Sequence, residues 1–322
     1  MKKVLLTGSA GFIGSHAADA LLARGDHVVG LDNLNSYYDP ARKKANVAEV
    51  QAANHPGRYD FVEGDIRDTA LLAGLFEQHA FDVVVHLAAM AGVRASMENP
   101  HLYYDVNLTG TLNLLEAARV SGLKNFVFAS TSSVYGDTTL HPFTETDRCD
   151  HPLAPYSASK RAAEMLGYTF HHLYGQNFTA LRFFTVYGPR GRPDMMAYKV
   201  LNNIFFGEEV PLYEGGNMKR DWTFVLDIVQ GIVRAADRPL GYEVINLGRG
   251  EETLLSDFVA RVEQLAGRKA KLISTPKLGA DVLETRADVS KARQLLGYDP
   301  KVSVPEGVEH FWNWYRGAIL KQ

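Results

Sequence analysis

Short apolar runs alternate with amphipathic stretches along the first 180 residues of the chain. The stretches carry apolar residues at helical spacing, notably at Gly11–Arg24, Thr69–His79, Tyr103–Val120 and Tyr156–Tyr174. The apolar runs predict strands at Val4–Thr7, His27–Leu31, Tyr59–Gly64, Asp82–Ala89, Asn125–Ser130 and Phe178–Phe184. Strands that alternate with helices predict an α/β fold, a doubly wound parallel sheet with helices on both faces. The unbroken runs VVVH and FVFA are expected where both faces of such a sheet are covered.

The pattern loosens after Gly188, where glycine and proline are frequent. Two further helices are expected at Asp227–Ala236 and Leu255–Ala266, and the segments EEVPLYEGG and KLISTPKLGADV are typical of short strands and loops. We therefore expect a first domain in residues 1–184 and a smaller α/β domain in residues 185–322. One later element could return to the first domain.

Composition and charge narrow the classes of function. The chain has 322 residues, of which 46% are hydrophobic and 22% charged, as in a globular protein. Its formal net charge of -3 gives no broad basic field, so nucleic acid is not an expected partner. The apolar run after the N-terminal lysines is too short for a signal peptide, and no run reaches the length of a membrane span. The single cysteine, Cys149, has no metal-ligand spacing around it, so we expect a cytoplasmic protein without a metal site.

A glycine-rich turn follows the first expected strand. Gly8, Gly11 and Gly14 in TGSAGFIG precede the first helix, where glycine permits a tight turn and a close approach of the backbone to a pyrophosphate. The spacing GxxGxxG is one residue longer than the common dinucleotide fingerprint, and a glycine pattern alone is weak. Asp32 strengthens it, because it ends the second strand near the offset of about 20 residues expected of an acid that binds the adenosine ribose.

Asp32 also indicates which dinucleotide is bound. A carboxylate accepts hydrogen bonds from a ribose 2′-hydroxyl and repels a 2′-phosphate, so NAD is favoured over NADP. The plain alternative is that Asp32 only caps a turn with Asn33. Residues after the third and fourth strands fall where the chain would line the adenine and the pyrophosphate, although core packing is the alternative for Ile66 and the alanines: Asp65, Ile66, Leu87, Ala88 and Ala89.

A tyrosine and a lysine stand four residues apart in YSASK, after the serine- and threonine-rich end of the fifth strand. On a helix, Tyr156 and Lys160 would project from one face. A nearby cation stabilises the phenolate, which lets a tyrosine act as a base near neutral pH. Alone, this pair is more simply a half-buried tyrosine and a surface lysine. The glycine turn, the ribose acid and the STSS run together favour a catalytic pair.

Several segments now form one pattern: GSAGFIG, HLAA, STSSVYG, YSASK, LRFFTVYGP and RDWTFVLDIV. The pattern covers nearly the whole chain and resembles the extended short-chain dehydrogenases/reductases that act on nucleotide sugars. Within them the chain is most similar to the UDP-glucuronate 4-epimerases, on the segments DNLNSYYDP, AGVRASMENP and FFTVYGPRGRPDMM. The resemblance implies a Rossmann-type domain in residues 1–184 and a UDP-sugar-binding domain in residues 185–322.

The resemblance also implies roles for single residues. Tyr156 would remove the proton from O4′ of the sugar, and Thr131 would hydrogen-bond the same oxygen. Lys160 would hold the nicotinamide ribose and lower the tyrosine pKa. NAD would be regenerated in each turnover and stay bound. Further positions at the cofactor would be Phe12, Ile13, Asn33, Asn35 and Phe183.

Two arginines in the GPRGRP loop raise a separate question. An arginine fork suits a carboxylate, so we expect Arg192, with Thr185, to grip the glucuronosyl carboxylate. Held away from the carbonyl π-system, that carboxylate would resist loss of carbon dioxide from the ketone formed at C4′. The alternative, which we favour for Arg190, is that these arginines bind phosphate or lie on the surface. Arg94 is a second candidate near the sugar.

On the nucleotide side, Arg220 matches the diphosphate arginine of related chains and Tyr213 the aromatic residue beside uracil. The chain departs from that pattern at LGADV (278–282), where an arginine is usual three residues before the aspartate. Arg286 could replace it.

Ser132 and Ser133 stand where 4,6-dehydratases and decarboxylases carry acids, which argues against both reactions. The nearest alternative is a UDP-glucose/galactose 4-epimerase, in which the position of Thr185 is typically asparagine. Another is a non-catalytic NAD-sensing protein, although such proteins usually lose the tyrosine or the lysine. The apolar helices Tyr103–Val120 and Tyr156–Tyr174 match a dimer interface of this superfamily, so we expect a homodimer; packing within the monomer is the alternative.

Overall fold

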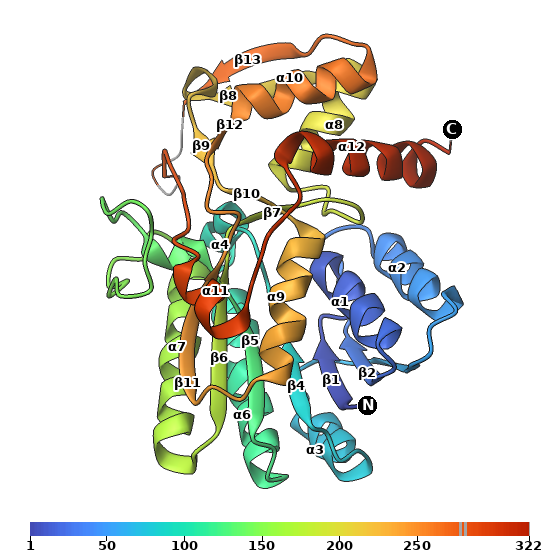
Figure 1. Cartoon of the computed structure of the whole chain (residues 1–322), viewed down its shortest axis with the longest axis vertical. Coiled ribbons are helices and arrows are strands. Elements are labelled where there is room, and N and C mark those ends of the chain that lie inside the picture. Colours follow the sequence, from blue (N-terminus) through green and yellow to red (C-terminus); the bar gives the residue numbers. More distant parts are fainter. Residues whose placement is uncertain (277–278, 280–281, 322) are drawn as a thin grey trace.

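The centre of the protein is a seven-stranded sheet, seen in a computed structural model that describes residues 1–276, 279 and 282–321. The strand order is β11-β6-β5-β4-β1-β2-β3, and every neighbouring pair is parallel (Figure 1). The strands are β1 (Lys3–Thr7), β2 (His27–Asp32), β3 (Arg58–Glu63), β4 (Val83–His86), β5 (Asn125–Thr131), β6 (Asn177–Phe183) and β11 (Tyr242–Leu247). The sheet grows outward on both sides of β1, which confirms the predicted doubly wound α/β fold.

Alternate residues of the central strands face opposite layers of helices. In β1, Val4 and Leu6 pack into one apolar cluster and Leu5 into another, and all three are fully buried. This follows from the two-residue period of a strand and explains why the runs are apolar throughout. One layer holds α1 (Phe12–Ala23), α2 (Pro40–Ala52) and α9 (Val225–Asp237); the other holds α3 (Thr69–Gln78), α6 (Gly110–Val120) and α7 (Pro155–Tyr174).

The helix expected at Tyr103–Val120 is interrupted. It consists of α5 (Pro100–Tyr104), a wide π-helical turn at Asp105–Thr109, and α6. Inside the wide turn, the buried side chain of Asn107 exchanges two hydrogen bonds with the backbone of Met90 (2.8 and 2.9 Å) and donates a third to Ser159 Oγ (3.0 Å). The extra residue of the turn thus ties the loop after β4 to helix α7, and such turns are frequent near functional sites.

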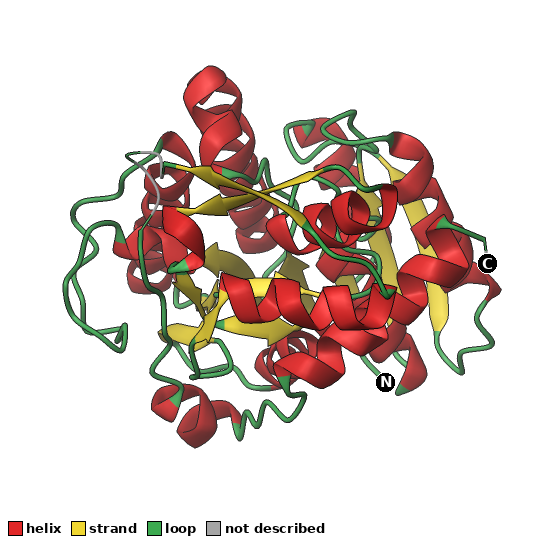
Figure 2. Cartoon of the chain, turned by 90° about the horizontal axis from the view of Figure 1, so that it is seen from above, coloured by secondary structure: helices red, strands yellow, loops and turns green. Residues whose placement is uncertain are grey.

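A smaller lobe lies beyond the carboxyl ends of the sheet strands (Figures 1 and 2). Here β8 pairs with β13, and short pairs join β7 to β10 and β9 to β12. The predicted segments EEVPLYEGG and KLIST do contain strands. The elements of the smaller lobe are β7 (Thr185–Tyr187), α8 (Met196–Phe206), β8 (Glu209–Tyr213), β9 (Lys219–Arg220), β10 (Trp222–Phe224), β12 (Thr253–Leu254), α10 (Leu255–Ala266), β13 (Lys271–Thr275) and α12 (Val304–Trp314).

The chain does not separate into two lobes at one point. Strand β11 and helix α9 lie after residue 184 in sequence, yet they belong to the sheet and its helical layer. The division at residue 184 therefore stays a prediction. Helix α11 (Ser290–Leu296) packs near β11, and α4 (Val93–Glu98) follows β4. Among the described residues, no helix is long and apolar enough to cross a membrane.

Candidate active site

Two neighbouring cavities open at the carboxyl ends of the strands. The first, of about 180 Å³, lies along the glycine turn and reaches Tyr156 and Lys160; we call it the cofactor cavity. The second, of about 460 Å³, lies between the sheet and the smaller lobe and contains Arg94, Thr185 and Tyr213; we call it the substrate cavity. Tyr37 and Arg192 line both cavities, so these two side chains mark where the cavities meet.

The glycine turn is built so that backbone lies directly on backbone. A Cβ atom added to Gly14 would lie 2.0 Å from the carbonyl oxygen of Gly8, and one added to Gly8 (φ +71°) would lie 2.7 Å from the nitrogen of Ala88. Helix α1 begins at this turn, and no described side chain caps it at Gly11. Its first N–H groups therefore remain available, which suits the pyrophosphate of a dinucleotide.

The expected ribose acid, Asp32, is buried at the end of β2 and lines the cofactor cavity. It accepts hydrogen bonds from the backbone of Ala10 (3.2 Å) and Leu34 (2.9 Å). Burial raises the pKa of Asp32, and the charge of Lys43 opposes this rise. Lys43 lies 3.9 Å from Asp32 and donates to Asn35 Oδ1 at 3.0 Å. Lys43 also lines the cavity and is a site residue that the sequence argument missed.

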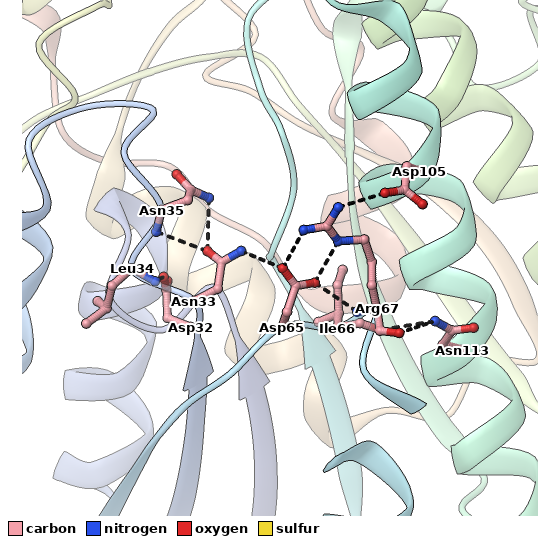
Figure 3. A network of polar contacts seen from close by, with 9 residues as sticks. All are labelled: Asp32, Asn33, Leu34, Asn35, Asp65, Ile66, Arg67, Asp105 and Asn113. Atoms are coloured by element: carbon pink, nitrogen blue, oxygen red, sulfur yellow. Dashed lines mark hydrogen bonds and ion pairs between the residues drawn. The ribbon is translucent and has the colours of Figure 1, made fainter. Parts of the chain in front are cut away.

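A polar network joins the loops after β2 and β3 at the far end of this cavity (Figure 3). Asn33 Nδ2 donates to Asp65 Oδ2 at 2.9 Å, and Arg67 donates to both carboxylate oxygens of Asp65 (3.0 and 2.8 Å). Arg67 also donates to Asp105 at 2.7 Å. The hydrogen bonds from Arg67 lower the pKa of Asp65 to about 2. The carboxylate therefore stays ionised as a fixed acceptor beside Ile66, which lines the cavity.

Tyr156 stands at the start of α7, beside Thr131 at the end of β5. Burial raises the pKa of Tyr156, whereas a hydrogen bond with Thr131 and the charge of Arg192 lower it. The sequence argument expected Lys160 to lower this pKa. In this structure Lys160 Nζ instead donates to the carbonyl of Ala129 at 2.9 Å, and burial lowers the lysine's own pKa to about 7.

Helix α7 is anchored by a buried ion pair one turn beyond the lysine. The carboxylate of Glu164 accepts two hydrogen bonds from Arg182 (2.9 and 2.8 Å), one from Ser130 (2.6 Å) and one from Arg161 (3.0 Å). Glu164 is fully buried and Arg182 is 1% exposed. Because Ser130 lines the cofactor cavity, this pair fixes helix α7, which carries Tyr156 and Lys160, against the end of β5.

The arginines of the GPRGRP loop have different environments. Arg190 donates to Asp19 on α1 (2.7 Å) and to Glu49 on α2 (2.9 Å), so it fastens the loop to the helical layer. Arg192 reaches the junction of the two cavities and bonds Asp194 through two of its nitrogens, at 3.0 and 2.9 Å. Arg190 therefore neither lines one of these cavities nor lies freely on the surface but joins the loop to two helices, whereas Arg192 lies at the candidate site.

The nucleotide side of the substrate cavity contains the expected Tyr213 and Arg220. Arg94 donates to the hydroxyl of Tyr213 at 2.6 Å and lies 4.5 Å from its ring centre. Arg220 donates to the carbonyls of Val282 (2.7 Å) and Leu283 (3.1 Å). Most of the LGADV segment lies outside the described residues. Arg286 lies 3.4 Å from Glu252 and, among the described residues, is not part of either cavity wall.

The structure brings together most of the predicted site residues. Four expected residues, all within the described ranges, line neither cavity directly: Asp65, Thr131, Ser132 and Ser133. Of these, Thr131 still contacts Tyr156, and the two serines form a short 3₁₀ turn after β5. The expected residues on the wall of the cofactor cavity are Gly8, Gly11, Phe12, Ile13, Gly14, Asp32, Asn33, Asn35, Ile66, Leu87, Ala88, Ala89, Tyr156, Lys160 and Phe183.

Comparisons with known proteins agree with this geometry. The model of the NAD dependent epimerase/dehydratase family matches residues 4–248. A UDP-glucuronate 4-epimerase of Thermodesulfobacterium geofontis is 43% identical and covers 98% of this chain and 96% of its own.

Two solved structures are similarly close in fold. The UDP-glucuronic acid 4-epimerase of Bacillus cereus, in complex with UDP-glucuronic acid and NAD, superposes with a TM-score of 0.89 at 34% identity, over 98% of this chain and 99% of that one. A UDP-glucose 4-epimerase of Thermotoga maritima with UDP-glucose gives a TM-score of 0.89 at 32% identity, with the same coverage. These matches confirm the resemblance found in the sequence.

Proposed function

The chain belongs to the NAD-dependent epimerase/dehydratase family, and we propose that it is a UDP-glucuronate 4-epimerase. It would interconvert UDP-glucuronate and UDP-galacturonate through a ketone at C4′. We choose UDP-glucuronate as the substrate because of the position of Arg192, which lines both the cofactor cavity and the substrate cavity where they meet. A glucuronosyl ring offers a carboxylate there, and a glucosyl ring offers only a neutral hydroxymethyl group.

The reaction begins with proton transfer. Tyr156 takes the O4′ proton, and Thr131, which contacts the tyrosine, steadies the same oxygen. The glycine turn and Asp32 would hold NAD, which would supply the redox chemistry at C4′ as acceptor and donor of hydride. Lys160, whose pKa burial lowers to about 7, would hold the nicotinamide ribose. Tyr156 returns its proton to O4′ at the end.

The ketone intermediate can lose its carboxylate as carbon dioxide, and Arg192 can suppress this side reaction. With a ketone at C4′ and a carboxylate on the neighbouring C5′, the oxidised sugar is a β-keto acid. It loses carbon dioxide when the bond from C5′ to the carboxylate lies parallel to the carbonyl π-system. The C5′–carboxylate bond then breaks, its electron pair moves to the C4′ oxygen as an enolate, and C5′ takes up a proton. A guanidinium fork that holds the carboxylate out of that alignment keeps the substrate intact.

Rival reactions have less support from the residues present. Ser132 and Ser133 supply no carboxylic acid for the elimination or decarboxylation reactions that related enzymes perform. UDP-glucose epimerisation is the second candidate, because the Thermotoga maritima enzyme has an equally similar fold. In UDP-glucose epimerisation, however, the sugar would offer Arg192 no charged group to bind.

We also propose that the protein is a cytoplasmic homodimer. Helices α6 and α7 lie against each other and keep large apolar side chains exposed, among them Val120, Met165, Tyr168 and Leu173. Large apolar side chains exposed on two packed helices favour a protein interface. The buried free thiol of Cys149 is compatible with a reducing compartment. Light scattering that gave the mass of a monomer would refute the dimer, and recovery from an oxidising compartment on cell fractionation would refute the location.

The deciding experiment supplies UDP-glucuronate to the purified protein without added cofactor and separates the products by chromatography and mass. A new product of unchanged mass is the expected result. Loss of the mass of carbon dioxide as the main outcome would identify a decarboxylase, and turnover of UDP-glucose alone would favour the second candidate. Arg192→Ala should lower kcat/KM for UDP-glucuronate by about 100-fold, as expected for loss of a charge-assisted pair. Arg148→Ala, on an exposed loop, is the matched control.

A further inference from the structure

At the junction of the two cavities, the side chain of Arg192 is paired with Asp194. Its Nε and Nη2 atoms donate to the two carboxylate oxygens of Asp194, at 3.0 and 2.9 Å. A two-bond pair of this kind fixes the plane of the guanidinium and its direction, because both groups are flat and rigid. Burial works against ionisation, but the hydrogen bonds and charge of Arg192 hold the pKa of Asp194 below its ordinary value.

The pair uses only one edge of the guanidinium. An arginine has five N–H donors, and Asp194 accepts two of them. Within the described ranges, the side chain of Arg192 donates no other hydrogen bond, although its backbone carbonyl accepts one from Met195 at 3.2 Å. The side chain keeps 23% of its surface accessible at the junction of the cavities. The opposite edge, with the remaining donors, is thus available for a second carboxylate.

Asp194 is itself supported from the other side of the site. The hydroxyl of Tyr37 donates to Asp194 Oδ2 at 3.3 Å, and the guanidinium carbon of Arg192 lies 5.7 Å from the centre of the Tyr37 ring. Gly92, with φ +102°, leaves room for this hydroxyl, since a Cβ at that position would lie 2.5 Å from it. Tyr37 comes from the loop that connects Asp32 at the end of β2 to α2, and it lines both cavities, so the support spans both of them.

We propose that Asp194, held by Tyr37, is the positioning residue that aims Arg192 at the substrate carboxylate and thereby sets the outcome of the reaction. This inference rests on the proposed UDP-glucuronate 4-epimerase function. Arg192 supplies the attraction for the substrate carboxylate, whereas Asp194, which carries the opposite charge, contributes direction. An arginine freed from Asp194 would still attract the carboxylate but would let it turn into alignment with the ketone.

The test compares three variants for both binding and product identity. Asp194→Asn removes the charge and one of the two acceptors, and Tyr37→Phe removes the supporting hydroxyl with little change in volume. Asp150→Asn is the matched control, because Arg148 and Asp150 form a pair of the same sequence spacing, at 3.0 Å, on an exposed loop outside both cavities. UDP-glucuronate turnover is measured for KM, kcat and the fraction of product that has lost carbon dioxide, and thermal unfolding confirms that each variant folds.

We expect the variants to change which product forms much more than they change substrate binding. For Asp194→Asn, KM should stay within about threefold of wild type, while the decarboxylated fraction should rise about tenfold, the effect of weakening one charge-assisted hydrogen bond. Tyr37→Phe should shift the fraction in the same direction by a smaller factor, and Asp150→Asn should match wild type. A folded Asp194→Asn variant with the wild-type product ratio would overturn the proposal. So would one with faster epimerisation, which would mean that Asp194 competes with the substrate. If the wild type itself leaves UDP-glucuronate unchanged, the proposed function fails instead.

Discussion

Replacing Glu164 by glutamine tests how much the buried ion pair beneath the catalytic helix contributes to stability. Glutamine keeps the shape of the side chain but removes its charge and turns an amide NH₂ toward N–H donors. Arg182 would then stay charged with 1% of its surface exposed, and its Nη1 atom already has no hydrogen-bond partner in the described structure. Among the described residues, Arg161 is the one other cation bonded to this carboxylate; 24% of its side chain is accessible, so it can turn to water.

The structure sets the size of the expected effect. Removing one partner from a buried pair leaves an uncompensated charge and destabilises by about 3–5 kcal/mol. With a urea m-value of about 3 kcal/mol/M, this lowers the midpoint of unfolding by roughly 1–1.7 M. The matched control is Glu116→Gln, which breaks the exposed pair with Arg119 at 2.8 Å and should change stability by less than about 1 kcal/mol.

Urea unfolding at several pH values checks both the size and the cause. The hydrogen bonds and charge of Arg182 hold the pKa of Glu164 below its ordinary value of 4.5 in the folded protein, although burial opposes them. A carboxyl group whose folded pKa is lowered stabilises fully above its unfolded pKa and loses this contribution as the pH falls through the folded value. The difference between wild type and Glu164→Gln should therefore be complete at neutral pH and shrink below 4.5. A difference under about 1 kcal/mol at pH 7 would contradict the reasoning.

Two further predictions concern the cofactor and the proton transfer. Gly14→Ala should yield protein without retained NAD, because the added Cβ would lie 2.0 Å from the Gly8 carbonyl oxygen; Gly74→Ala, with nothing within 4 Å, should retain it. The readout is NAD released by heating after gel filtration, and retention by Gly14→Ala would refute the backbone-contact argument. Tyr156→Phe should lower kcat by about 10²–10⁴ without changing NAD retention, which a turnover assay beside the same extraction would check.

Much of the fold could be predicted because the apolar periods are regular. The helix expected at Leu255–Ala266 coincides with α10, and six of the seven strands of the sheet were located to within a few residues. The seventh, β11, was not predicted as a strand. The strand expected at Asp82–Ala89 was too long: β4 ends at His86, because the following backbone turns to pack on Gly8. Helix α2 was not predicted, although Asp39 caps it and Pro40 begins it, which is a recognisable helix start.

The candidate site was predictable where a local motif carries the chemistry. The glycine turn, Asp32, Tyr156 and Lys160 lie together as their spacing suggested. Contacts between distant segments gave no such signal. Lys43 reaches the cofactor cavity from a helix with no motif, and Glu164 meets Arg182 only because α7 packs across β6. The wide turn around Asn107 depends on a hydrogen bond to Met90 that helical periodicity does not reveal.

The return of β11 to the sheet has a consequence for how this molecule can be divided. The chain leaves the sheet after β6, contributes to the smaller lobe, and comes back to supply the seventh strand before leaving again. A gene fragment that stops at residue 184 would lack this edge and the apolar face of α9, so β6 would present an unpaired border that invites aggregation. We therefore expect that residues 1–184 cannot be moved into another protein as an independent folding unit without β11 and α9.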